Sequence, residues 1–155
     1  MLNLEHAFLY STSIELADAI PVGPTPNGVR MIINVTGGAV EGPLIKGRVL
    51  NSGADWAVLR PDGTVAIDVR CAIETDDGAH IYVTYGGRID VPESLAPRFS
   101  DPELVEDIDP SDYYFRITPY FETSSEKYAW LNKVVAVGLG KRTKAGVYYD
   151  VFEIK

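Results

Sequence analysis

The stretch Thr64–Asp90, TVAIDVRCAIETDDGAHIYVTYGGRID, decides the fold. Two runs rich in Val, Ile, Thr and Tyr, which strands favour, flank the turn sequence Asp76-Asp77-Gly78. A three-residue loop with Gly in its last, left-handed position joins antiparallel strands into a hairpin. The stretch therefore predicts paired strands at 64–75 and 79–90.

Pro61-Asp62-Gly63 is a second turn of the same kind and lies just upstream. It predicts that residues 54–60 form a strand paired with 64–75, with Trp56 opposite Asp68. In the first hairpin the same reasoning sets Glu74 opposite His80. Three consecutive strands, joined by two tight turns, therefore form a meander.

The rest of the chain repeats this composition, with 14 glycines and 10 prolines between strand-like segments. We predict strands at roughly 4–14, 29–36, 43–50, 54–60, 64–75, 79–90, 113–123, 130–139 and 146–154. Short helical turns are expected only at 13–20 and 101–107. Many short strands favour a sandwich or a barrel, and the contiguous meander favours a barrel. The prediction is one all-β domain, residues 1–155, formed by a single antiparallel β-barrel of about 8–10 strands with little helix.

Two segments lack strand patterns. Residues 21–28, PVGPTPNG, hold three prolines and two glycines and are predicted to be a loop. The acidic stretch 91–112 is predicted to be a solvated excursion between strands, and its length makes a lid over a pocket the alternative.

The charge balance narrows the possible partners. Among 155 residues, Lys and Arg number 14 and Asp and Glu 22, giving a net charge of −8. This charge disfavours binding to nucleic acid and to anionic lipid. No apolar run approaches the roughly 20 residues of a membrane helix, and the N-terminus does not resemble a signal peptide. A cytoplasmic protein without membrane association is expected.

The usual motifs of catalytic and metal sites are missing. The single cysteine, Cys71, lies between apolar neighbours and is predicted to be a small buried hydrophobe rather than a reactive thiolate. His6 and His80 do not have metal-ligand spacing, although a mixed site of His80 with carboxylates is an alternative. Neither a P-loop nor a dinucleotide fingerprint is present. We expect no metal and no cofactor.

Side chains on a strand alternate between two faces, and the faces of this meander differ sharply. The odd-numbered face is almost continuously apolar. The even-numbered face carries Trp56, Asp68, Arg70, Glu74, His80 and Tyr82. Either this mixed face lines a barrel lumen that binds a small molecule, or it faces solvent while the apolar face forms the core. Both faces look partly covered, which favours a homo-oligomer, a dimer or higher.

Several segments occur in a familiar order: Gly53-Ala54-Asp55-Trp56, Asp62-Gly63-Thr64, Asp68-Val69-Arg70, Glu74-Thr75-Asp76-Asp77-Gly78, Ile81-Tyr82-Val83, Tyr114-Phe115-Arg116, Phe121-Glu122-Thr123 and Tyr128-Ala129-Trp130-Leu131-Asn132. In this combination the chain resembles the bacterial and fungal family known as domain of unknown function 3237. The resemblance runs from Leu4 to the closing strand Val147–Ile154. It implies a single antiparallel β-barrel and a soluble protein, and no general activity. Cys71 departs from the pattern, since an aromatic residue often follows the Asp-x-Arg segment in such proteins.

The resemblance implies that its shared polar and aromatic residues surround one barrel mouth or lumen, which favours the pocket interpretation. The predicted catalytic residues are Asp68 as base, Tyr82 as acid or oxyanion donor, and Arg116, which holds negative charge together with Arg70. The other predicted substrate-binding residues are Asp55, Trp56, Glu122, Trp130 and Asn132.

The predicted function is binding of a small carbonyl or phenolic compound. Its sharper form is metal-free acid/base catalysis of isomerase, cyclase or lyase/hydratase type. The alternative is a non-catalytic ligand carrier or an oligomeric accessory protein.

Overall fold

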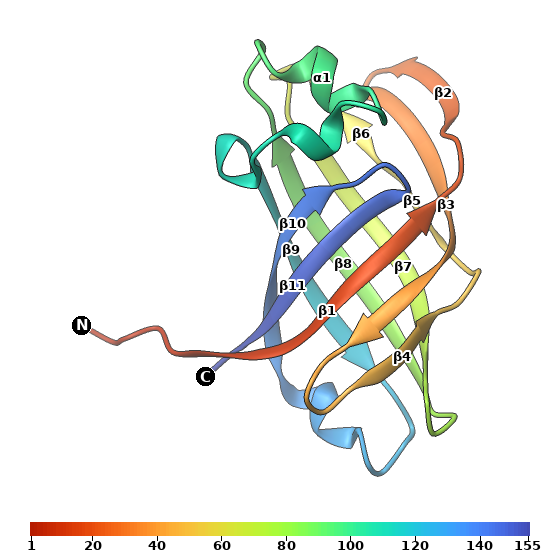
Figure 1. The fold of residues 1–155 in the computed structure, drawn as a ribbon, viewed down its shortest axis with the longest axis vertical. Coiled ribbons are helices and arrows are strands. Elements are labelled where there is room, and N and C mark those ends of the chain that lie inside the picture. The colour runs from red at the N-terminus through yellow and green to blue at the C-terminus, as the bar shows by residue number, and fades with distance from the viewer.

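The computed structural model describes residues 1–155 and consists almost entirely of β-strands (Figure 1). The strands are β1 (His6–Leu16), β2 (Ile20–Thr25), β3 (Gly28–Glu41), β4 (Lys46–Val49), β5 (Ala54–Asp55), β6 (Val58–Leu59), β7 (Val65–Thr75), β8 (His80–Asp90), β9 (Tyr114–Glu122), β10 (Val135–Arg142) and β11 (Gly146–Ile154). The helical elements are α1 (Ala96–Ser100) and the 3-10 turns η1 (Val105–Asp107), η2 (Pro110–Asp112) and η3 (Ala129–Lys133). None of the helices is long and apolar enough to cross a membrane.

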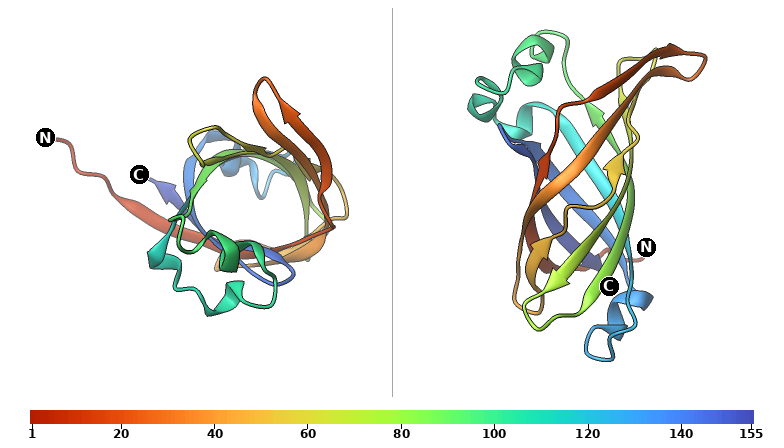
Figure 2. Two further views of the ribbon diagram at one scale, coloured as in Figure 1. Left: turned by 90° about the horizontal axis from the view of Figure 1, so that it is seen from above. Right: turned by 90° about the vertical axis from the view of Figure 1, so that its right-hand side faces the viewer.

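All strands belong to one antiparallel sheet with the order β1-β11-β10-β9-β8-β7-β4-β3-β2. Strand β1 also pairs with β3, so the sheet closes into an eight-stranded barrel. The short strands β4, β5 and β6 share the place between β7 and β3. Figure 2 shows the closed ring from above. The predicted all-β antiparallel barrel is confirmed.

Both predicted hairpins are present in the predicted registers. Glu74 lies opposite His80, and the Trp56 N–H donates to the Asp68 carbonyl at 2.9 Å. Gly63 and Gly78 have φ angles of +85° and +86°, the left-handed conformation that the turns require. Local turn chemistry therefore determines these two registers.

The seam between β1 and β3 depends on Gly38. Its φ is +142°, and a Cβ at this position would lie 2.0 Å from the Ser13 carbonyl oxygen. The two backbones can approach to pairing distance because no side chain stands between them.

The apolar odd-numbered face of the meander fills the barrel. Cys71 and its inward neighbours on β7 are at most 5% exposed, as are Ile81, Val83 and Tyr85 on β8. Tyr149 from β11 packs edge-to-face against Tyr85 and Phe115, with ring centroids 5.6 and 5.3 Å apart. The core is therefore the barrel interior, continuous across the strands.

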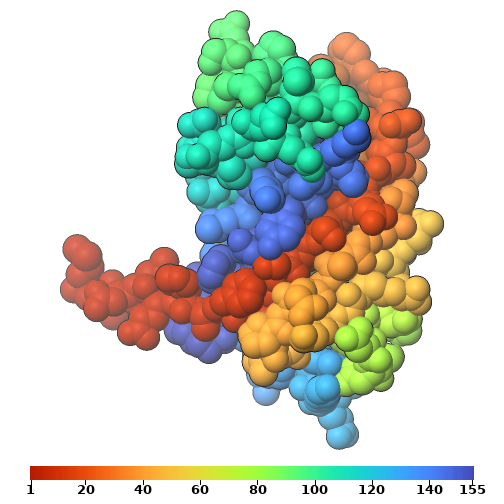
Figure 3. Space-filling view, viewed as in Figure 1, coloured from red at the N-terminus to blue at the C-terminus, as the bar shows by residue number.

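Residues 91–112 lie over one side of the upper end of the barrel (Figures 1 and 2). Buried Phe99 anchors the segment by packing edge-to-face on Tyr113, with centroids 5.0 Å apart. Lys144, in the β10–β11 turn, fastens it with an ion pair to Glu103 at 2.6 Å, and the Lys144 N–H donates to Glu106 at 3.1 Å. Figure 3 shows the segment packed against the β10–β11 end of the molecule.

Some element predictions were wrong. The predicted loop 21–28 contains most of strand β2, which carries Pro21 and Pro24 and pairs only with β3. Proline is tolerated there because the edge of a sheet leaves N–H groups unpaired anyway. Residues 13–20 are mainly the end of β1 rather than a helical turn, while 101–107 does contain η1. Residues 130–133 belong to η3, so the strand predicted at 130–139 begins only at Val135.

Candidate functional site

The even-numbered face of the meander lies outside the barrel, so the prediction that it lines the lumen is wrong. The Asp68 and Arg70 side chains are 57% and 49% exposed and form an ion pair at 3.3 Å. The Arg70 guanidinium also stacks over the Trp56 ring, 5.2 Å from its centroid. The physical reason is that burial of the continuous apolar face outweighs burial of charges.

The neighbouring predicted residues share this outer surface. Tyr82 is exposed and lies opposite exposed Glu122 on β9. The Arg116 guanidinium lies over the ring of exposed Tyr114, 5.0 Å from its centroid. Asp68, Tyr82 and Arg116 line neither of the two cavities inside the barrel, so their predicted roles find no enclosed site there. The predicted homo-oligomer stays a prediction.

Trp130 and Asn132 belong to η3, and the chain between β9 and β10 lies at the opposite end of the barrel from the 91–112 segment (Figure 1). The Asn132 side chain accepts a hydrogen bond from the Thr123 N–H at 2.8 Å and donates one to the Thr123 carbonyl at 3.0 Å. Both polar groups of the Asn132 side chain therefore hold the chain after β9 in place. This residue has a structural role rather than the predicted role in ligand binding.

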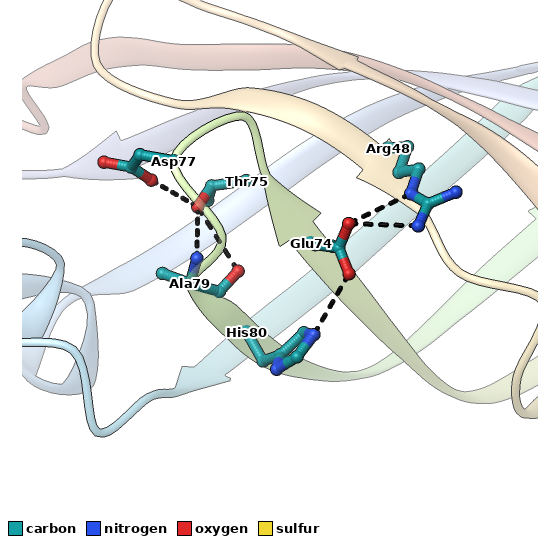
Figure 4. A network of polar contacts seen from close by, with 6 residues as sticks. All are labelled: Arg48, Glu74, Thr75, Asp77, Ala79 and His80. Atoms are coloured by element: carbon teal, nitrogen blue, oxygen red, sulfur yellow. Dashed lines mark hydrogen bonds and ion pairs between the residues drawn. The ribbon is translucent and has the colours of Figure 1, made fainter.

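His80 also lies on the outer surface. Glu74 accepts hydrogen bonds from Arg48 at 3.0 and 3.2 Å, and its other oxygen contacts the His80 ring at 3.2 Å (Figure 4). In the adjacent turn, Thr75 donates to Asp77 at 2.6 Å and accepts from the Ala79 N–H at 2.9 Å. These contacts form a network on the surface that holds neighbouring strands and a turn together.

Asp55 is the one predicted site residue that lines the main cavity inside the barrel; a more open hollow of about 770 Å³ lies on the outer surface over β1 and β3. The cavity has a volume of about 300 Å³ and occupies the upper part of the barrel, beneath the 91–112 segment. Of its 24 lining residues 17 are hydrophobic, among them Ile33, Ile67, Val69, Phe99 and Phe115. A concave, mainly apolar cavity with few polar groups is typical of a small-molecule site.

Backbone pairing fixes the position of Asp55. The two-residue strand β5 is held between β3 and β7, where Asp55 lies opposite Ile33 and Val69. One carboxylate oxygen accepts a hydrogen bond from the Asp68 N–H at 3.0 Å. The carboxyl is thus oriented by the sheet, and no protein group forms a hydrogen bond to its second oxygen.

The surroundings of Asp55 raise its pKa to about 6. Burial is the largest cause, because a low-dielectric environment penalises the carboxylate. The hydrogen bond from the Asp68 N–H opposes this shift, the charge of the Asp68 carboxylate adds to it, and the charge of Arg30 lowers the pKa. The carboxyl can therefore both hold and release a proton close to neutral pH.

Two buried tyrosines complete the polar part of the cavity. Tyr85 and Tyr149 both line it, and burial is the main reason that the pKa of each phenol lies above its usual value. The Asp55 charge contributes to both shifts, so the three groups are electrostatically coupled. Both phenols stay protonated. A hydrogen bond with Tyr149 contributes to the raised pKa of Tyr85, so the Tyr149 hydroxyl is the one that can donate to a ligand oxygen.

Sequence reasoning missed both tyrosines. Tyr85 belongs to the apolar face, which the favoured interpretation placed outside the lumen, and it stands there as a polar exception after Ile81 and Val83. That break in an aliphatic row was the available signal. The sequence offered no such signal for Tyr149, because the register of its strand against the other strands depends on barrel closure.

A second cavity of about 20 Å³ lies deeper in the barrel and shares Tyr85 and Tyr149 with the first. Cys71 lines it and is 5% exposed. Burial raises the pKa of its thiol to about 12, so it is a protonated, unreactive group near neutral pH. The prediction of a buried hydrophobe is confirmed.

Two cations reach the main cavity from the β10–β11 end. Lys144 is bound to Glu103, as described above. Arg142 is partly buried, and its guanidinium stacks over Phe99, 5.8 Å from the ring centroid. The site therefore combines a titratable carboxyl, two buried phenols, apolar walls and a positive charge at its rim, which suits acid/base chemistry on a bound organic molecule.

Comparison with known proteins agrees with the fold. A protein from Rhodopseudomonas palustris, UPF0311 protein RPA1785, is 35% identical over 158 residues, covering 98% of this chain and 97% of its own. The crystal structure of RPA1785 superimposes with a TM-score of 0.92 at 34% identity, over 100% of both chains. A β-barrel-like protein from Acinetobacter baumannii is 39% identical with a TM-score of 0.85, over 100% of this chain and 98% of that one.

One similar protein has a named activity. The hydroalkoxylation enzyme phnH of Penicillium herquei is 32% identical over 136 residues, covering 88% of this chain and 72% of its own. Residues 2–154 match the family described as protein of unknown function (DUF3237). With the barrel, the sequence identities and this match in agreement, the chain belongs to the DUF3237 family.

Proposed function

We propose that this protein is an enzyme that binds a small, mainly apolar organic molecule in its barrel and transfers a proton with Asp55. The observation that carries the proposal is the Asp55 carboxyl. It is fixed by the Asp68 N–H, lies in an apolar cavity of about 300 Å³ and has a pKa raised to about 6. Such a group can act as general acid and general base in one catalytic cycle.

The fungal relative supports one reaction class, the addition of a hydroxyl group across a carbon–carbon double bond. In the proposed step, protonated Asp55 gives its proton to one alkene carbon. The hydroxyl oxygen of the same molecule forms a bond to the neighbouring carbon, and the hydroxyl proton returns to Asp55. The product is an isomer of the substrate, so no atom or electron is gained or lost.

Tyr85 and Tyr149 have a supporting role in this proposal. Both phenols stay protonated, and the Tyr149 hydroxyl can orient the ligand by donating a hydrogen bond to a ligand oxygen other than the attacking one, with Tyr85 bound behind it. The apolar walls exclude water, which would otherwise compete with the hydroxyl for the cationic carbon.

The test uses 2-prenylphenol as the probe in D₂O. The wild-type protein is expected to form 2,2-dimethylchroman with one deuterium on the carbon that receives the proton. The Asp55→Asn variant keeps the size of the side chain but cannot donate that proton, so turnover is expected to fall about 100-fold or more. Mass spectrometry of the product measures the incorporated deuterium.

The matched variant is Asp68→Asn, which makes the same change outside the barrel and leaves the Asp68 N–H in place. It is expected to keep nearly all activity. Equal losses in the two variants would contradict a specific role for Asp55. A wild-type protein that binds this and other unsaturated phenols without converting any would support the alternative, a ligand carrier.

A further inference from the structure

Arg142 occupies an unusual place on β10. Side chains that point inward on this strand follow the even numbers, and Ala136, Gly138 and Gly140 are all buried. The glycines are required by close packing, since a Cβ at Gly140 would lie 2.7 Å from the Phe115 ring. Arg142 continues this inward row at the mouth, where it lines the main cavity, while exposed Lys141 faces outward.

The Arg142 guanidinium has no acidic partner. It belongs to none of the ion pairs of the protein, and its side chain donates no hydrogen bond to a protein group. Burial is the single cause that lowers its pKa, so no nearby carboxylate compensates for the lost hydration. The ring of Phe99 lies beneath it and limits its movement.

The other charged groups around the cavity differ from Arg142 in their surroundings. Lys144 is neutralised by Glu103 at 2.6 Å, and Asp18 is exposed at the rim. The charge of Arg30 affects the pKa of Asp55, whereas that of Arg142 does not. The Asp55 carboxyl and the Arg142 guanidinium therefore lie in separate parts of the cavity. Between them the walls are mainly aliphatic and aromatic.

We infer that the ligand of this cavity is an amphipathic organic acid whose carboxylate binds Arg142 at the mouth, with its apolar body extending toward Asp55. This inference rests on the proposed function, because it assumes that the cavity is the ligand site. A planar guanidinium matches a carboxylate with two parallel hydrogen bonds, and in a partly dehydrated site such a pair is strong. Arg142 therefore selects the ligand and sets which of its ends reaches Asp55.

The test compares 2-naphthoate with 2-naphthamide, which have the same ring system and nearly the same shape but differ in charge. Isothermal titration calorimetry with the wild-type protein is expected to show at least about tenfold tighter binding of 2-naphthoate. Arg142→Met is expected to abolish this preference by weakening naphthoate binding alone. Arg142→Lys, which keeps the charge but loses the planar fork, is expected to retain part of it.

Two controls assign the effect to the cavity. Lys141→Met removes one positive charge from the adjacent, outward position and is expected to leave the preference unchanged. Ile67→Trp fills the cavity and is expected to abolish binding of both compounds. Thermal unfolding of every variant shows whether each is folded, and Arg142→Lys carries the test if Arg142→Met is not.

The outcomes separate this inference from the proposed function. Equal affinities for the two compounds in wild type, or an equal loss in Arg142→Met and Lys141→Met, would overturn the role of Arg142 and leave the cavity as a binding site. Binding that survives Ile67→Trp would overturn both proposals. Asp55→Asn is expected to keep the preference for naphthoate, because Asp55 contacts the other end of the ligand.

Discussion

Asp55 illustrates how a single residue can weaken the fold while equipping the site. In the unfolded chain its carboxyl has an ordinary pKa near 3.8, and in the folded protein burial raises that pKa to about 6. The folded state therefore holds the proton more tightly than the unfolded state. The benefit is complete below about pH 4, is lost as the pH rises through about 6, and leaves an ionised carboxylate in an apolar cavity above that.

Asp55→Asn should consequently stabilise the protein at neutral pH. The pKa difference corresponds to up to about 3 kcal/mol in the free energy of unfolding above pH 7, and to almost nothing below pH 4. Urea unfolding of both proteins from pH 3.5 to 8 measures this difference. A variant that is less stable than wild type at pH 8 would show that the carboxylate is well accommodated and would contradict the raised pKa.

At the scale of elements, the 91–112 segment stands apart from the barrel. Its anchors are Phe99 on Tyr113, the contacts of Lys144 with Glu103 and Glu106, and the buried side chains of Val105 and Ile108, which belong to the core. The strands, in contrast, are held by continuous ladders. A segment of short helical turns, held by side chains and without a ladder of backbone hydrogen bonds to the sheet, opens locally at lower free energy than the strands do.

Phe99→Ala is therefore expected to loosen this segment without unfolding the barrel. Hydrogen exchange of amides 93–109 should accelerate about tenfold or more, while amides of β7 and β8 keep their rates. The matched variant, Ile81→Ala, removes a buried side chain from the barrel itself and should cost about 2–5 kcal/mol of global stability. Parallel acceleration in segment and strands for Phe99→Ala would show that the segment is part of the cooperative core.

Some of the strands and registers could be predicted from the sequence, and others could not. The two hairpin registers followed from Gly63 and Gly78, because a tight turn fixes pairing through neighbours in the chain. Strand β2 escaped prediction because Pro21 and Pro24 are compatible with a strand only at a sheet edge, which is a property of the assembled sheet. Asp55 was a correct lead to the cavity, while Asp68, which adjoins Val69 opposite Asp55 on β7, faces outward.

At the scale of the whole molecule, the decisive fact is closure of β1 onto β3. Which face of the meander points inward depends on how the sheet curves and closes, and pairing between residues far apart in the chain decides this. The alternation within 64–90 marked one face as apolar and so favoured its burial, but the pocket interpretation was preferred over that signal. The outward position of Asp68, Arg70 and Tyr82 is the direct result of how the sheet closes.

The closure of the barrel at the β1–β3 seam can be tested by comparing two glycine-to-alanine variants. Gly38→Ala should destabilise the protein by about 3 kcal/mol or more, because the new Cβ would lie 2.0 Å from the Ser13 carbonyl oxygen at the seam. Gly63→Ala also places a side chain at positive φ, but nothing lies within 4 Å, so about 1 kcal/mol is expected. Equal costs in urea unfolding would mean that the seam adapts without strain.

The closed ring leaves β2 as the one strand whose outer edge pairs with nothing. An open edge offers a row of unpaired amides to other chains, and such edges seed fibrils and precipitates. Here Pro21 and Pro24 remove two of the N–H groups that a docking strand would need. The prolines that made this segment look like a loop thus disfavour the docking of a further strand on this edge.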